Sequence, residues 1–240
     1  MSNINIEEAL ESLFSEYNSE YSILVDLPSK GKGYKVNNKS IKIKAMNFDD
    51  EKFIASYRGD DLIDQLLLKC SDVKDLDELY IEDKLFLYFK LREASFGSTF
   101  KMESECIHCG FLNSLEIDIN KLKVDYAEDT FTDPTEVMLP MLKKSVSVTK
   151  MRSYLQEYSS SEAMLLENLW RFIKKIDHHE DPVLIAQAIK KLSSKDIRTI
   201  MSAINTKQFG LDTRAMFVCS KCNKENVASV GLSFDFFTES

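Results

Sequence analysis

The pattern of apolar and polar residues predicts a chain that mixes helices and strands. Residues 5–17 carry apolar side chains three and four places apart with glutamates between them, which is the pattern of an amphipathic helix. Residues 40–44 alternate between isoleucine and polar side chains, which predicts a half-exposed strand. Helical spacing returns over about 48–57, 60–70 and 81–95.

The second half of the sequence shows wider helical patterns. Apolar residues between Ala163 and Ile176 form a broad stripe at helical spacing, and a second stripe runs from Ile197 to Ile204 behind a serine cap. The group His178-His179-Glu180-Asp181 follows the first stripe. Because the dipole of a helix favours histidine near the C-terminus, we interpret this group as a solvated helix end rather than a second metal site.

Four landmarks of the first half recur in the same order in the second half. Val-x-Leu-Pro occurs at 25–28 and 137–140, and a strand pattern that ends in Met follows each copy. Phe-Gly precedes each of two Cys-x-x-Cys pairs by eight residues, and an asparagine, Asn113 or Asn226, lies four places beyond each pair. The ordered set predicts two copies of one unit, made of a strand, helices and a hairpin with two cysteines.

Four of the five cysteines form the two pairs, Cys106 with Cys109 and Cys219 with Cys222. Strand-like runs flank each pair, and turn-forming residues follow it, so each pair is expected at the tip of a hairpin. Two such hairpins facing each other would form a tetrahedral four-sulfur zinc site. We therefore expect one structural Zn²⁺ per chain, held by these four cysteines and joining the first half to the second. Unrelated buried thiols, disulfides and a thioredoxin-like redox site fit two complete pairs between strands less well.

Composition limits the functions that the chain can have. Its 240 residues are 44% hydrophobic and 29% charged, which indicates a folded protein with a real core. The net charge of −8 disfavours broad binding to nucleic-acid phosphates. No apolar run approaches the roughly 18 residues that span a bilayer, and no signal peptide is indicated. A reducing cytoplasm fits cysteines that are kept available for metal, and Cys70 is expected to be a small buried hydrophobe.

No catalytic motif stands out in the sequence. Gly-x-Ser-x-Gly, His-Glu-x-x-His and the dinucleotide-binding glycine pattern are absent, and Gly31-Lys32 lacks the spacing of a phosphate-binding loop. A zinc ion held by four thiolates has no open position for water, so it is structural rather than catalytic. We expect no catalytic residues and no small-molecule substrate, which leaves binding as the activity.

Several stretches together resemble one protein family. They are the N-terminal helix, the loop Leu27-Pro28-Ser29-Lys30-Gly31 with Tyr34, the run Asp61-Leu62-Ile63-Asp64-Gln65-Leu66-Leu67, and the passage Arg92-x-x-Ser95-Phe96-Gly97 into the first cysteine pair. In these the chain resembles the baseplate hub assembly protein family of T-even-like contractile-tailed bacteriophages. The resemblance implies a late viral protein that binds other baseplate hub proteins, in the host cytoplasm during tail assembly or in the tail baseplate of the virion. It carries over no enzymatic residues.

The alternative is a zinc-ribbon module of a nucleic-acid-processing complex. The acidic balance of the chain and the lack of a basic and aromatic patch around either cysteine pair disfavour it. A zinc-dependent hydrolase would need a ligand position held by water.

The expected fold is α+β, with two similar halves joined through a zinc-ribbon-like four-cysteine site. The expected divisions are an N-terminal amphipathic helix over 1–22, a first repeat over 23–122, an acidic connector over 123–136 and a second repeat over 137–240.

Two segments are candidate contacts for protein partners. The N-terminal helix could dock its apolar stripe in a groove of a partner, and the C-terminal aromatic tail is expected to be exposed. The alternative is that both segments pack on the protein itself. The residues are Leu10, Leu13, Phe14 and Tyr17 in the helix and Phe234, Phe236 and Phe237 in the tail.

Overall fold

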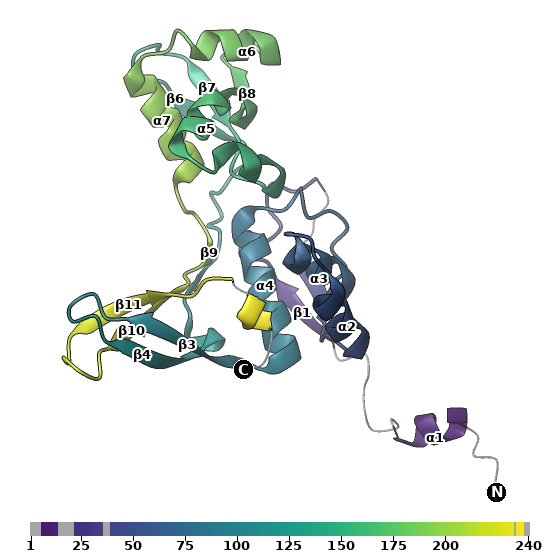
Figure 1. Ribbon diagram of the computed structural model, residues 1–240. Helices are drawn as coiled ribbons and strands as arrows, with labels where there is room; N and C mark the ends of the chain where they lie inside the picture. Colours follow the sequence, from purple (N-terminus) through teal and green to yellow (C-terminus); the bar gives the residue numbers. More distant parts are fainter. Residues whose placement is uncertain (1–5, 14–21, 36–38, 233, 238–240) are drawn as a thin grey trace, which may run out of the picture.

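The structure is a computed structural model that describes residues 6–13, 22–35, 39–232 and 234–237. The described chain forms two lobes and an arm, and the N-terminal helix α1 (Ile6–Leu13) stands apart from them (Figure 1). This mixture of helices and small antiparallel sheets confirms the α+β class. No described helix is both long and apolar enough to cross a membrane.

The first lobe pairs strands β1 (Ser22–Asp26) and β2 (Ser40–Lys44) and packs three helices on them. Helix α2 (Phe48–Ser56) begins at Asn47, where the Asn47 and Asp50 side chains form a reciprocal capping box that satisfies free backbone amides. Helix α4 (Ile81–Phe96) runs through the core, with Phe86, Leu87, Phe89 and Leu91 all buried. The third helix is α3 (Leu62–Cys70).

The second lobe contains a three-stranded antiparallel sheet in the order β6 (Thr135–Met138), β7 (Ser145–Val148) and β8 (Ile173–Ile176). Its own core centres on Leu139, Leu169 and Phe172, all fully buried. The helical segments are 3-10 turns at Ser153–Ser159 and Leu169–Phe172 with α5 (Glu162–Glu167), α6 (Pro182–Ile189) and α7 (Ser194–Asn205).

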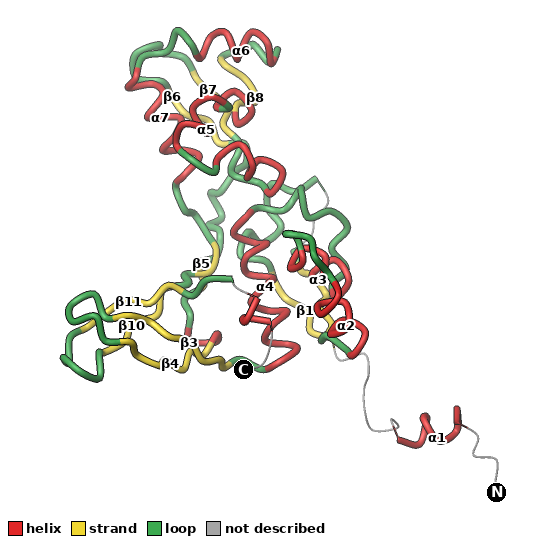
Figure 2. The backbone as a smooth tube through the Cα atoms, in the orientation of Figure 1, coloured by secondary structure: helices red, strands yellow, loops and turns green. Residues whose placement is uncertain are grey.

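The arm consists of two hairpins that come from opposite halves of the chain. Strands β3 (Thr99–Glu105) and β4 (Leu112–Asp118) form the first hairpin, and β10 (Arg214–Val218) and β11 (Glu225–Ser229) form the second. At the base of the arm β5 (Val124–Asp125) pairs with β9 (Gly210–Leu211). Beyond this pair, loops lead to the second lobe and back (Figure 2).

The hairpins of the two halves share one register. Val25 pairs with Ile41 in the first lobe, and Val137 pairs with Val146 in the second. The fully buried Leu27 and Leu139 follow these strands, and each donates its amide across the turn at 2.9 Å. In the arm the closing pairs Glu105–Leu112 and Val218–Glu225 take the same places relative to the cysteines.

The third strand of the second lobe also has a reduced counterpart in the first lobe. Val148 on β7 pairs with Ile173 on β8, and Ile43 on β2 forms a single bridge to Ser71. The Phe-Gly landmarks are alike as well, because Gly97 and Gly210 both adopt positive φ angles, 87° and 115°. A side chain at Gly210 would also collide with Glu82 on α4, since its Cβ would lie 2.8 Å from that of Glu82.

One predicted helix is wrong. The apolar stripe between Ala163 and Ile176 does not form a continuous helix but α5, a 3-10 turn and the strand β8. The segment joins the edge of the sheet, where β7 supplies backbone partners and both Ile173 and Ile176 are buried. Tertiary pairing therefore overrides the helical spacing, and His178 and His179 follow a strand rather than a helix.

The segment 123–136, expected to be an acidic connector, does more than link the two repeats, because it packs against other parts of the chain. It contains β5 and the first residues of β6, and the amide of Ala127 donates to the carbonyl of Pro28 at 2.8 Å. Ala127 and Phe131 pack with Tyr80 and Phe209 in a small core between the lobes. The division of the chain at 1–22, 23–122, 123–136 and 137–240 stays a prediction.

Candidate metal centre

The local sequence bends the tip of each arm hairpin in the same way. In the first, the amide of Cys106 donates to the carbonyl of Phe111 at 2.9 Å, and the amide of Gly110 donates back to Cys106 at 2.9 Å. In the second, Cys219 donates to Lys224 at 3.0 Å and Asn223 to Cys219 at 2.9 Å. Gly110 and Asn223 adopt left-handed φ angles of 67° and 56°, which glycine and asparagine tolerate best. Each turn therefore presents its two thiols on one side.

The turns bring the four thiols of the two pairs together. The sulfurs of Cys106, Cys109, Cys219 and Cys222 all lie within 4.8 Å of one another. Across the two hairpins, the Cys106 and Cys222 sulfurs are 3.6 Å apart, and those of Cys109 and Cys219 are 3.7 Å apart. Zinc–sulfur bonds of about 2.3 Å would place the sulfurs of a regular tetrahedron about 3.8 Å apart. The thiols thus have the spacing of a tetrahedral metal site.

The pKa values of Cys106, Cys109 and Cys219 reflect the hydrogen bonds and close sulfurs around them. Burial raises the pKa of Cys219, but amide hydrogen bonds from Cys222 and Lys221 outweigh it and lower that pKa to about 6. The pKa of Cys106 is likewise lowered, because amide hydrogen bonds outweigh burial. For Cys109 the amide of Phe111 lowers the pKa, whereas burial and the neighbouring sulfurs raise it to about 12. Four thiolates this close repel one another unless a cation lies between them.

Two buried asparagines hold the hairpins together beside the sulfurs. Asn113 Oδ1 accepts from the amide and the hydroxyl of Ser220 at 3.0 and 3.1 Å. Asn226 Oδ1 accepts from the amide of Ile107 at 3.1 Å. Each asparagine thus reaches the turn of the opposite hairpin, at the residue that directly follows the first cysteine of that turn. The repeated spacing of Asn113 and Asn226 was the sequence signal for this contact.

The remaining histidines and cysteine lie outside the four-sulfur group. His108 is exposed, and its Nε2 lies 3.3 Å from the carbonyl oxygen of Glu225. Cys70 is fully buried in the first lobe, as expected, and burial there raises its pKa to about 12. The His178 side chain is 91% exposed and lies 3.5 Å from Asp177. Among the described residues the four arm cysteines form the one group with metal-ligand spacing.

The two candidate partner segments differ from each other. On α1, Leu10 and Leu13 are exposed at 48% and 76%, whereas Phe14 and Tyr17 lie outside the described residues. The expectation of an exposed tail is wrong for Phe236 and Phe237, which are 4% and 2% exposed. Phe236 packs its ring against Phe89 and Phe100, because the core of the first lobe offers it apolar partners at the base of the arm. The Phe234 side chain is outside the described part.

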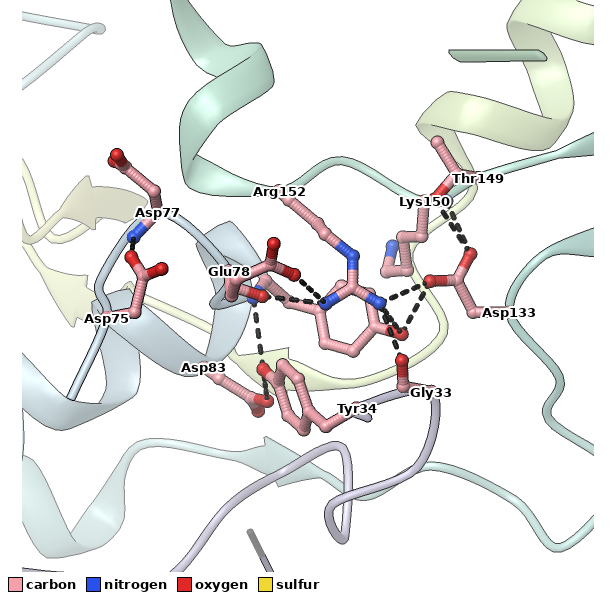
Figure 3. A network of polar contacts seen from close by, with 11 residues as sticks. Gly33, Tyr34, Asp75, Asp77, Glu78, Asp83, Asp133, Thr149, Lys150 and Arg152 are labelled. Carbon is pink, nitrogen blue, oxygen red and sulfur yellow. Dashed lines mark hydrogen bonds and ion pairs between the residues drawn. The ribbon is translucent and has the colours of Figure 1, made fainter. Parts of the chain in front are cut away.

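Another contact between the halves is buried and polar, and we name it the polar junction: Gly33, Tyr80, Asp133 and Arg152. Figure 3 labels Gly33, Asp133 and Arg152 among these. Arg152 Nη2 lies 2.8 Å from Asp133 Oδ2 and donates to the carbonyl of Gly33 at 2.8 Å. It also donates to Tyr80 Oη at 3.1 Å, and the Tyr80 hydroxyl donates to Asp133 at 2.7 Å. The side chains of Arg152 and Asp133 are 9% and 2% exposed, so the ion pair is shielded from water.

Sequence reasoning missed the polar junction and a related pair of aspartates. Asp83 on α4 accepts from the amide of Ser29 at 2.9 Å, and Asp196 on α7 accepts from the amide of Met141 at 2.8 Å. Each aspartate precedes the first cysteine of its hairpin by 23 residues, which is a further repeat spacing that could have found them. Asp133 and Arg152 have no such signal, since Asp133 lies in the segment 123–136, which the sequence predicts to be an acidic connector.

The chain was also compared with known proteins. A family described as T4 bacteriophage base plate protein has a model that matches residues 19–238. No match was found among curated proteins or among solved structures.

Proposed function

Because the chain belongs to the T4 bacteriophage base plate protein family, we propose that it acts as a non-catalytic hub component or hub assembly factor of the tail baseplate. The family match over nearly the whole chain carries this proposal. Its activity would be the binding of other hub proteins, either in the host cytoplasm during assembly or in the virion tail. The absence of an enzymatic motif from the sequence supports binding rather than catalysis.

The four-cysteine group is proposed to hold one structural Zn²⁺ per chain. Sulfur spacings of 3.6 and 3.7 Å support a tetrahedral ion, and four thiolate ligands are the donor set that zinc takes in closed structural sites. The residues Cys106 and Cys109 come from the first hairpin and Cys219 and Cys222 from the second, so the ion would close the arm. Elemental analysis of the purified chain should give one zinc per chain. Protein without zinc and with four freely titrating thiols would reject the site.

The two halves are inferred to be copies of one unit. The shared hairpin registers, the paired aspartates Asp83 and Asp196 and the equivalent cysteine turns support this inference. A duplicated unit explains why each half supplies half of the sulfur ligands. It also makes the arm the place where the copies meet around an approximate twofold axis.

Helix α1 is the proposed contact for hub partners. Its exposed Leu10 and Leu13 form an apolar stripe beside acidic residues, which suits docking into a groove of another protein. Phage carrying Leu10→Asp and Leu13→Asp should accumulate incomplete tails, seen by electron microscopy, while the purified variant stays folded. Leu24→Asp is the control, because Leu24 is an exposed leucine on β1, at 73%, away from α1.

The helix and the function are tested separately. Normal tails from the α1 double variant would remove α1 as the contact and leave the function standing. Normal tails from phage that lack the whole chain would reject the role in assembly. Co-purification from infected cells, followed by mass spectrometry, should recover other baseplate proteins with the wild-type chain.

A further inference from the structure

The two asparagines beside the metal centre form a reciprocal clasp. Each donates its Nδ2 to a carbonyl of its own hairpin two residues earlier, Asn113 to Phe111 at 2.9 Å and Asn226 to Lys224 at 2.8 Å. Each directs its Oδ1 to the opposite turn, where it accepts from the amide of Ser220 or Ile107. Both side chains are buried, at 4% and 3% exposed, so these bonds are shielded from competing water.

We propose that Asn113 and Asn226 are the residues that assemble the two half-sites, so that the arm is closed before a metal ion binds. Each hairpin carries two of the four thiols, and neither can form a four-sulfur site alone. In the clasp, the bridging amides donate to asparagine oxygens and not to the sulfur ligands. These hydrogen bonds can therefore form in the metal-free protein. The metal centre itself rests on the proposed function, whereas the clasp does not.

The clasp is asymmetric at the sulfurs. Asn113 Nδ2 also lies 3.7 Å from the sulfur of Cys219, in position to donate a weak hydrogen bond to that thiolate. Among the hydrogen bonds of the described residues, Asn226 makes no equivalent bond to a cysteine sulfur. Asn113 therefore both positions the hairpins and reduces the charge density on one ligand, whereas Asn226 only positions. Such outer contacts orient ligands and tune the metal.

The order of assembly can be tested by hydrogen exchange in protein freed of metal by a chelator. In the wild type, the amides of Ile107 and Ser220 should stay protected. Asn226→Ala should release the Ile107 amide, and Asn113→Ala should release the Ser220 amide, each without releasing the other. The amides of Cys106 and Cys219 bond within their own hairpins and report that each hairpin remains folded.

The outcome that overturns the clasp is specific. If the Ile107 and Ser220 amides of the metal-free wild type exchange without protection while those of Cys106 and Cys219 stay protected, the metal and not the asparagines brings the hairpins together. A wild type that binds no zinc would reject the metal centre, but protected Ile107 and Ser220 amides would still support the clasp. The two failures are therefore distinguishable.

Metal titration tests the second part of the proposal. Asn113→Ala and Asn226→Ala should each weaken Zn²⁺ affinity by about 10- to 100-fold in a chelator competition. With Co²⁺ as a spectroscopic probe, the sulfur-to-metal charge-transfer band should shift in Asn113→Ala and Asn113→Asp but not in Asn226→Ala. Asn113→Asp keeps an oxygen that can accept from Ser220, so it should retain that amide's protection while the band still shifts. Equal bands in all the variants would remove the role of Asn113 at the sulfur.

Discussion

Two of the contacts between the halves of this protein are built differently, the four-cysteine centre of the arm and the polar junction. The centre uses equivalent residues from both halves, two cysteines and one asparagine from each. The junction joins unlike residues: Asp133 from the connecting segment, Arg152 from the second lobe, and Gly33 and Tyr80 from the first. The proposed duplication of one unit would explain the first contact, whereas the second joins residues that do not occupy matching positions in the two halves.

The difference predicts how each contact fails. If the centre holds the proposed Zn²⁺, it can be emptied and refilled, and its strength depends on metal concentration. The junction depends on the shielding of an ion pair, and loss of one partner leaves a buried charge.

The largest effect is expected from loss of the metal centre. Cys106→Ser and Cys219→Ser should each lower the stability of the whole chain, because the ion would clamp one half to the other and its binding energy is coupled to folding. Structural zinc provides on the order of 10 kcal/mol in small zinc-binding peptides, so a loss of several kcal/mol is expected here. Thermal unfolding with and without a chelator measures it. Fraying confined to one hairpin, with both lobes unchanged, would contradict the clamp.

The next largest effect is expected at the polar junction. Arg152→Met should cost about 3–5 kcal/mol, because Asp133 would keep a buried charge without its cation. The double variant Arg152→Met with Asp133→Asn should recover part of that loss. Urea unfolding of both single variants and the double variant measures the coupling. Independent, additive losses would show that Asp133 and Arg152 do not depend on each other for their contribution to stability.

A smaller and opposite pair of effects is expected at the matched aspartates. Burial outweighs the Ser29 and Tyr34 hydrogen bonds and raises the pKa of Asp83 to about 6, while hydrogen bonds from the Met141 amide and Ser193 outweigh burial and lower the pKa of Asp196. The contribution of Asp83 to folding stability is therefore present below its unfolded pKa near 4 and is lost as pH rises through its folded pKa of about 6. The contribution of Asp196 is present above its unfolded pKa and is lost as pH falls through its folded value.

Variants separate the two aspartates. Between pH 4 and 7, rising pH should lower the stability of the wild type relative to that of Asp83→Asn. The change should reach up to about 3 kcal/mol, because the pKa of Asp83 is raised by about two units on folding. As pH falls below about 4, the difference should move in favour of Asp196→Asn. Denaturant midpoints across this pH range measure both, and parallel curves for the two variants would contradict the opposite signs.

The smallest effect is expected on the outer faces of the arm. Met216 on β10 is 68% exposed, and the equivalent place on β3 holds the exposed Glu103. Met216→Glu should therefore change stability by less than about 0.5 kcal/mol, since an exposed site away from caps and charges contributes little to folding. Thermal unfolding of the zinc-loaded protein checks it. A larger loss would mean that this face packs against another part of the chain.

The parts of the fold that depend on local spacing could be predicted from the amino-acid sequence. The Cys-x-x-Cys turns, the asparagines four places beyond them and the Phe-Gly positions recur in both halves, so the amino-acid sequence alone shows their equivalence. The α+β class followed from alternating and helical apolar patterns. These features are local because a turn or strand register depends on neighbouring residues.

The remaining features depend on contacts between segments that are distant in the sequence. The stripe from Ala163 to Ile176 has helical spacing, yet its last residues form a strand that pairs with β7. This pairing satisfies the backbone and also buries Ile173 and Ile176. The aromatic tail packs on the first lobe because Phe89 and Phe100 provide apolar contacts for the ring of Phe236. Asp133 and Arg152 lie 19 residues apart in sequence, and their pairing depends on the packing that shields both side chains from water, which no local spacing reveals.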